Sequence, residues 1–84
     1  MSDAPQTRVK DVNYYMELPY AIRLVPPDPK HPDDTWFAEI LELKGCMTSG
    51  DTREEVLKKI EEAKYTWIEM SLEHGDPIPE PHRD

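Results

Sequence analysis

One long amphipathic pattern near the C-terminal end constrains the fold more than any other feature. Thr52 is placed as an N-cap whose hydroxyl can accept from the Glu55 amide, while the Glu55 side chain reaches back to the Thr52 amide. Gly75 provides a left-handed position, and Pro77 prevents continuation. The intervening apolar residues recur at helical spacing: Val56, Ile60, Ala63, Trp67 and Met70, flanked by Leu57, Ile68 and Leu72. The pattern predicts a helix ending at His74, with one broad apolar stripe packed on a sheet.

The chain is short enough for one core only. Its 84 residues fall below the ~100–200 residues usual for a domain, so we expect one domain over residues 11–81. A flexible arm at 1–10 precedes this domain and a short tail at 82–84 follows it. The single cysteine, Cys46, cannot form an internal disulfide. A chain of this size buries only about 60–65 % of its extended surface, so a partner subunit would add stability.

Three short apolar segments upstream predict the sheet. Residues 20–25 alternate in the strand period, residues 35–43 are rich in aromatic and branched side chains, and residues 46–49 allow a short third strand after a glycine turn. The proline-rich residues 26–34 form a stiff loop between the first two strands, which we expect to pair antiparallel. Residues 11–18 carry too short an apolar pattern for more than one docked helical turn.

These elements predict an α+β fold of β-β-β-α order, with one long helix on one face of a small antiparallel sheet. The sheet has three strands, or four if the tail adds an edge strand. A sheet covered on one side leaves its other face to water or to another molecule. Trp67 is expected in the core, whereas Trp36 and Phe37 point to opposite faces of their strand, so one of them lies away from the helix.

The net charge of the chain excludes some classes of binding partner. Asp and Glu outnumber Lys and Arg by 18 to 10, which gives a formal net charge of −8. This balance argues against direct binding of nucleic acid or an anionic membrane and suits a basic partner. No apolar run is long enough to span a membrane and the N-terminus lacks the regions of a signal peptide, so we expect a cytoplasmic protein.

No residue pattern predicts catalysis, a metal or a cofactor. The histidines, His31, His74 and His82, do not share ligand spacing, and His74 in the last helical turn suits the helix dipole. Ser49 lacks a nucleophile elbow, and Cys46 lacks a signal for a lowered pKa. The glycines are isolated, so no phosphate cradle exists. Most carboxylates are expected to be solvated.

The ordered residues resemble the HicB-like antitoxin family over about residues 14 to 81. The residues that carry the resemblance are Tyr15, Leu18-Pro19-Tyr20, Ala38-Glu39, Gly45-Cys46, Gly50-Asp51-Thr52 with Glu54-Glu55, Ala63, Trp67-Ile68, Gly75 and Ile78-Pro79-Glu80-Pro81. The chain departs from the family pattern at Lys44, where a proline often stands, at Val56, where alanine is usual, and in the longer loop 26–34. It resembles a short form without a DNA-binding domain.

The resemblance implies a partial ribonuclease-H-like fold and a labile antitoxin that inhibits a small basic HicA-type ribonuclease by covering its active site. We expect the acidic and aromatic residues of the hairpin to bind this partner: Asp33, Asp34, Trp36 and Glu39. Resemblance to a nuclease fold does not imply nuclease chemistry. The predicted strands offer only Glu39 and Glu42, whose spacing places them on opposite faces, so we expect no enzyme.

Two other functions remain open on the sequence. The first is an orphan interaction module without a toxin, which forms homodimers or higher oligomers through its open sheet face or its tail. The second is a small enzyme, which would need a cluster of ionisable groups in a cleft.

Overall fold

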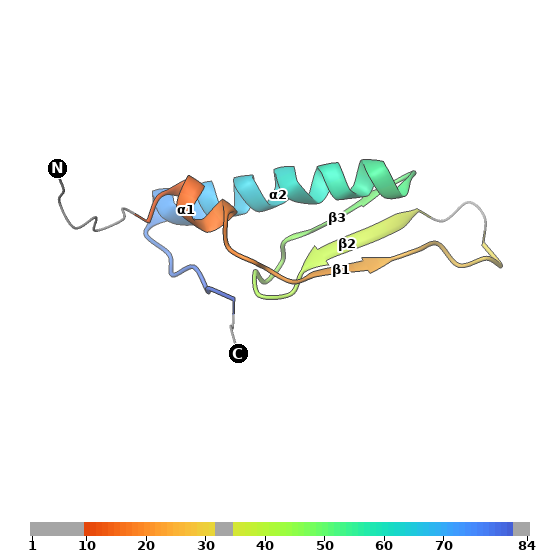
Figure 1. Cartoon of the computed structure of the whole chain (residues 1–84), viewed down its shortest axis with the longest axis horizontal. Helices are drawn as coiled ribbons and strands as arrows, with labels where there is room; N and C mark the ends of the chain where they lie inside the picture. The colour runs from red at the N-terminus through yellow and green to blue at the C-terminus, as the bar shows by residue number, and fades with distance from the viewer. Residues whose placement is uncertain (1–9, 32–34, 82–84) are drawn as a thin grey trace, which may run out of the picture.

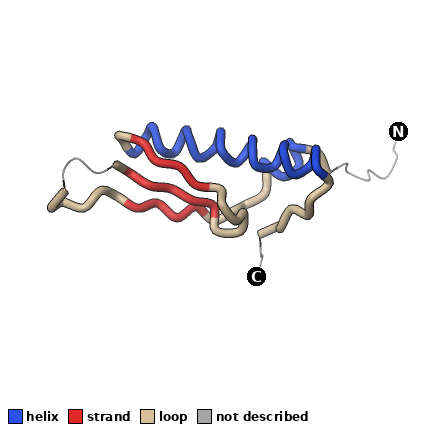
Figure 2. The backbone as a smooth tube through the Cα atoms, turned by 180° about the vertical axis from the view of Figure 1, so that it is seen from behind, coloured by secondary structure: helices blue, strands red, loops and turns tan. Residues whose placement is uncertain are grey.

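The structure is a computed structural model that describes residues 10–31 and 35–81. In chain order it contains α1 (Val12–Met16), β1 (Ile22–Val25), β2 (Trp36–Ile40), β3 (Met47–Gly50) and α2 (Arg53–His74). The long helix α2 lies along one side of the sheet, and α1 packs beside the C-terminal part of α2 (Figure 1, Figure 2). This arrangement confirms the predicted α+β class and the β-β-β-α order.

The sheet has the antiparallel order β1-β2-β3. Ala38 at the centre of β2 pairs with Leu24 on β1 and with Thr48 on β3. The first two strands are shorter than the predicted ranges 20–25 and 35–43. Within the described residues the sheet has these three strands, and the segment after α2 adds no fourth strand.

β2 ends at Ile40 because the chain turns there. Leu43 donates its N–H to the Ile40 carbonyl at 3.2 Å, and Cys46 donates to the Leu43 carbonyl at 2.9 Å. Gly45 has φ +85°, a left-handed conformation that glycine adopts without steric cost. The turn directs the Leu43 and Cys46 side chains into the core, where both are buried.

The ends of α2 follow the predicted caps, with one difference. Thr52 accepts a 3.0 Å hydrogen bond from the Glu55 amide, and Gly75 takes the left-handed position with φ +72°. The predicted return contact from Glu55 to the Thr52 amide is wrong, because the Glu55 carboxylate accepts from the Asp51 amide instead. Both amides precede the first helical turn and lack an intrahelical acceptor, so the carboxylate satisfies an unpaired donor in either arrangement.

The buried stripe of α2 differs from the predicted stripe in its second half. The buried positions are Val56, Ile60, Lys64, Ile68 and Ser71. Met70 and Leu72, which were expected beside the core, are 48 % and 36 % exposed. Met70 lies two residues after Ile68, about 200° around the helix axis, so it cannot share the buried side. Ala63 and Trp67 are half-buried and pack against the core from one flank.

Lys64 is a charged residue inside the stripe, with only 5 % of its surface exposed. Its Nζ lies 3.4 Å from the Glu61 carboxylate and 5.9 Å from the centroid of the Tyr20 ring. The aliphatic stem therefore fills core volume while the ammonium meets an aromatic face and a carboxylate at the edge.

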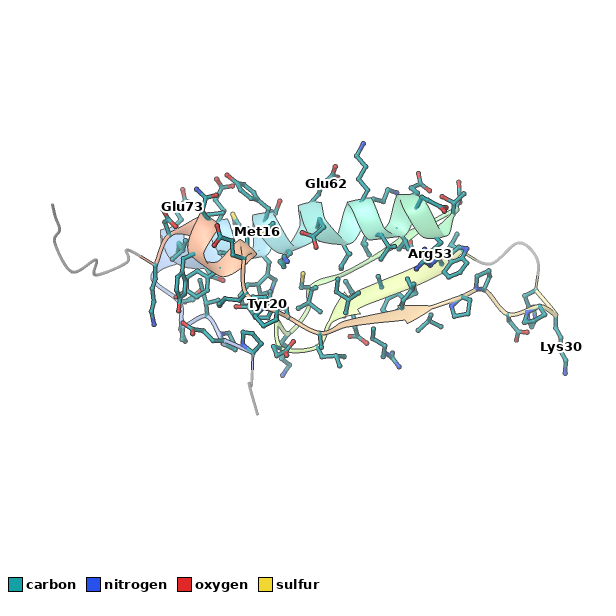
Figure 3. The ribbon with its side chains drawn as sticks, in the orientation of Figure 1. Met16, Tyr20, Lys30, Arg53, Glu62 and Glu73 are labelled. Atoms are coloured by element: carbon teal, nitrogen blue, oxygen red, sulfur yellow. The ribbon has the colours of Figure 1, made fainter. Side chains whose placement is uncertain are left out.

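The core continues from the sheet to the residues after α2. Its buried apolar members are Tyr15, Tyr20, Ala38, Ile40, Leu43, Cys46, Val56, Ile60 and Ile68. Tyr20 lies where the chain passes from α1 to β1 (Figure 3). The Tyr20 hydroxyl donates to the Pro79 carbonyl, and the Tyr14 hydroxyl to the Glu80 carboxylate. Ile78 packs against the same core, so the segment after α2 is fixed to the fold. Neither described helix is long and apolar enough to cross a bilayer.

Candidate protein-binding surface

The strand register divides the sheet into a helix-covered face and a face directed away from α2. Successive side chains of a strand point to opposite faces, and directly paired residues of neighbouring strands share a face. Ala38 and Ile40 are buried beneath α2, so Phe37 and Glu39 point away from it. Their pairing partners complete the surface here called the open face, which consists of Arg23, Val25, Phe37, Glu39, Met47 and Ser49.

An ion pair lies in the middle of the open face. Arg23 Nε is 2.8 Å from Glu39 Oε1, and the two residues are direct partners across β1 and β2. The Arg23 side chain is 58 % exposed and that of Glu39 is 22 % exposed. A solvent-exposed pair of this kind adds only about 0–1 kcal/mol to stability, so its main effect here is to neutralise the centre of the face.

Apolar side chains surround this ion pair. Met47 is 48 % exposed, and Val25 and Phe37 are half-buried. Leu41 is 56 % exposed, and its N–H donates to the Ala21 carbonyl at 3.1 Å, which continues the β1–β2 pairing past the end of β2. Leu41 therefore lies in the turn directly after β2, at the end of the sheet beside Ala21. Grouped exposed apolar side chains with polar neighbours are typical of a protein-binding surface.

The structure separates the residues expected to bind a partner. Glu39 lies on the open face. Trp36 lies on the opposite face of β2, the face that α2 covers, and packs half-buried against the core. Phe37 is therefore the aromatic residue of β2 that faces away from the helix. Asp33 and Asp34 lie outside the described residues.

Sequence reasoning did not select Arg23, Val25 or Met47 for this surface. The alternation of each strand was readable, but grouping the three residues needed the pairing register between strands. A register in which Glu39 pairs with both Arg23 and Met47 brings them together.

The ionisable groups near the sheet have structural partners. Glu42 lies in the turn after β2, where its carboxylate accepts from the Ala21 amide at 3.1 Å. Desolvation raises the pKa of the buried Cys46 thiol, and the nearby charge of Lys64 opposes this rise. In the described parts of the chain no group of three or more His, Cys, Asp or Glu side chains is arranged to hold a metal ion.

A long helix on one side of a three-stranded sheet, with exposed apolar residues on the other side, is typical of a small α+β protein that binds a protein partner. The chain belongs to the HicB-like antitoxin family of bacterial toxin–antitoxin systems, whose family model matches residues 22–83. This match confirms the resemblance seen in the sequence. Membership suggests a role in a toxin–antitoxin system.

Two relatives are similar over part of the chain. A UPF0150 protein of Thermoplasma acidophilum is 36 % identical over 50 residues, which cover 60 % of this chain and 72 % of that protein. A UPF0150 protein of Synechocystis is 36 % identical over 44 residues, which cover 52 % of this chain and 60 % of that protein. No solved structure matches the chain.

Proposed function

We propose that this protein is an antitoxin that binds a small basic HicA-type ribonuclease and inhibits it by covering its active site. The family match over residues 22–83 carries the proposal. In this role the protein acts in the cytoplasm, needs no cofactor and performs no catalysis of its own. Inhibition then depends on how its surface fits that of the toxin.

The charge of the chain supports a basic partner. A ribonuclease must attract the phosphates of its RNA, so its active-site surface is positive. The present chain has a net charge of −8, and opposite charges on two proteins accelerate their encounter and orient them. An acidic protein that occupies this surface competes directly with the RNA.

The open face supplies the contact surface in this proposal. Met47 is an exposed apolar residue that a partner would bury, and Phe37 between the outer strands adds aromatic area. Glu39 gives a negative group that a cation of the toxin can share with Arg23. We propose the same role for Asp33 and Asp34 in the loop, while Trp36 supports the hairpin from the helix side.

An orphan module that associates only with itself is the second candidate. Self-association through the open face would bury the exposed Met47 side chain, which favours this alternative. Two copies with a charge of −8 each repel one another, which opposes it.

Co-purification tests the proposal. The tagged protein is recovered from its native cells at low and moderate salt, and proteins present in stoichiometric amount are identified by mass. We expect a small basic protein whose ribonuclease activity falls when the antitoxin is added, with weaker association at higher salt. Recovery of copies of this chain alone would support the orphan module, and a basic partner without ribonuclease activity would contradict the toxin assignment.

A matched pair of variants tests the contact surface. Met47 on the open face and Met70 on the outer side of α2 are both 48 % exposed. Met47→Lys places an ammonium against the basic partner and should weaken inhibition at least tenfold, while Met70→Lys should leave it unchanged. If the two variants change inhibition equally, the open face is not part of the interface with the toxin.

A further inference from the structure

The outer edge of β3 carries backbone groups that point away from the sheet. Ile40 donates its N–H to the Cys46 carbonyl at 2.9 Å. Hydrogen bonding alternates along an antiparallel pair, so Thr48 directs its N–H and C=O toward β2, while Met47 and Ser49 direct theirs outward. Within the described residues β3 is an edge strand, and an edge with free donors and acceptors is a template for another strand.

A groove of about 500 Å³ runs beside this edge, between β3 and α2. Thr48 of β3 lines one wall, and Ala63 and Trp67 of α2 line the other, with Lys59 and Glu62 at the rim. Trp67 is held in place because its indole N–H donates to the Lys44 carbonyl at 2.9 Å. Figure 1 shows β3 as the strand nearest α2, and Figure 3 labels Glu62 on the helix.

We infer that an extended segment of a basic protein partner binds in this groove as a fourth strand beside β3. Its backbone would pair with the outward groups of Met47 and Ser49, and every second side chain would enter the groove against Ala63 and Trp67. The basic character of the partner rests on the function proposed above. The strand geometry rests on the β3 edge and the groove alone.

The opposite edge of the sheet does not offer the same site. Ile22 and Leu24 carry the outward backbone groups of β1, because Leu41 bonds to Ala21 on the other side. Among the described elements α2 contacts β2 and β3 but not β1. An added strand at β1 would therefore lack a covering helix.

The net negative charge of this chain favours a basic partner over a second copy as the occupant of the groove. The exposed anionic residues of α2 are Glu54, Glu55, Glu61, Glu62, Glu69 and Glu73. The exposed cationic residues of the same helix are Arg53, Lys58 and Lys59. At the rim of the groove Lys59 and Glu62 balance one another, so the preference comes from the helix as a whole and from the net charge of −8, which repels a second copy and attracts a basic segment.

A synthetic peptide provides a direct probe. Blocked peptides of alternating lysine and valine, about six residues long, are titrated into the isotope-labelled full chain and followed by amide spectra and hydrogen exchange. We expect shifts at Met47, Ser49 and the Trp67 indole, and slower exchange of the Met47 and Ser49 amides. Shifts centred on Ile22 and Leu24, or no binding, would overturn the inference.

Two peptide controls separate the contributions. N-methylation of alternate amides removes the backbone pairing and should weaken binding at least tenfold without any change in the protein. Replacement of lysine by glutamate should weaken binding to a similar extent. Equal binding of the N-methylated peptide would rule out strand addition, and equal binding of the acidic peptide would rule out a basic occupant.

A matched pair of proline variants tests the edge in the protein. Ser49→Pro removes an outward N–H from β3, and Ile22→Pro removes one from β1; both positions are exposed. Peptide binding should fall at least tenfold in Ser49→Pro only, with the unfolding midpoint of each variant measured alongside. Dimerisation of the unmodified chain that Ser49→Pro abolishes would identify a second copy as the occupant and overturn the inference.

The peptide experiments and the toxin experiment fail separately. If a peptide adds to β3 but no ribonuclease co-purifies, the strand site is supported and the proposal of a toxin partner is contradicted. Inhibition of a ribonuclease that Ser49→Pro leaves unchanged supports the antitoxin and overturns the strand site.

Discussion

The hydroxyl of Tyr20 donates a 2.6 Å hydrogen bond to the carbonyl of Pro79 and so joins the start of the sheet to the segment that follows α2. The Tyr20 ring is buried, with 8 % of its surface exposed, and the Lys64 ammonium lies 5.9 Å from the ring centroid. One side chain thus connects the entry to β1, the buried stripe of α2 and the C-terminal segment. Loss of this contact should loosen all three.

The Tyr20 hydroxyl should make the free energy of unfolding fall at alkaline pH. Desolvation, followed by the nearby charge of Glu80, raises the pKa of Tyr20 from 10.0 to about 12. The folded state holds the phenolic proton more tightly than the unfolded state. The stabilisation that the protonated Tyr20 hydroxyl gives is therefore complete below pH 10 and is lost as the pH rises through about 12. We expect deprotonation of Tyr20 to lower the free energy of unfolding by about 2 kcal/mol.

Urea unfolding between pH 8 and pH 12 measures this loss, with Tyr20→Phe as the control. The variant should be about 1 kcal/mol less stable at neutral pH, because it lacks the hydrogen bond to Pro79. It should also lose less stability than the parent protein above pH 10. Parallel pH profiles for the two proteins would show that the Tyr20 hydroxyl does not titrate as described.

Lys64 should stabilise the fold through its stem more than through its charge. Lys64→Met keeps the length of the side chain and should change the free energy of unfolding by about 1 kcal/mol or less. Lys64→Ala removes buried volume beneath Tyr20 and should cost about 2 kcal/mol or more. Chemical denaturation of both variants decides the point, and a larger cost for methionine than for alanine would assign the stabilisation to the ammonium.

The fold was predictable where the determining residues are close in sequence. Thr52 and Gly75 define both ends of α2 because capping uses the backbone of adjacent residues. The burial of Lys64 was not predictable, because it depends on Tyr20, which is distant in sequence and reaches the helix only in the folded chain. The turn after Ile40 was missed because Leu41 and Leu43 also fit a strand pattern.

The candidate surface was predictable only in part, for a related reason. Alternation along β2 separates Trp36 from Phe37, but it does not say which of the two faces the helix. Burial of Ala38 and Ile40 decides this, and burial follows from the position of α2 over β2 and β3. Glu39 was selected from the sequence, whereas its partner Arg23 emerged from the register.

Gly50 should tolerate no side chain. A Cβ atom at this position would lie 2.9 Å from the Val56 nitrogen and 3.1 Å from its Cα, so the start of α2 would have to move away from β3. Gly50→Ala should lower the free energy of unfolding by about 1–3 kcal/mol. The adjacent exposed residue gives the control, since Ser49→Ala should change it by about 0.5 kcal/mol or less. Equal thermal midpoints for both variants would contradict the close approach of helix and strand.

The Arg23–Glu39 ion pair should matter more for association than for folding. A double-mutant cycle with Arg23→Gln and Glu39→Gln should give a coupling energy of about 0.2–1 kcal/mol in the free protein, and the coupling should shrink as salt rises. The Arg23 side chain is 58 % exposed, so water already stabilises much of its charge.

In association with a basic protein, the substitutions of Arg23 and Glu39 should act in opposite directions. Glu39→Gln removes an attractive charge from the open face and should slow association, whereas Arg23→Gln removes a repulsive charge and should accelerate it. Stopped-flow association rates at low and moderate salt measure both effects. Rates that both variants change in the same direction would show that the pair acts through the shape of the open face and not through its charge.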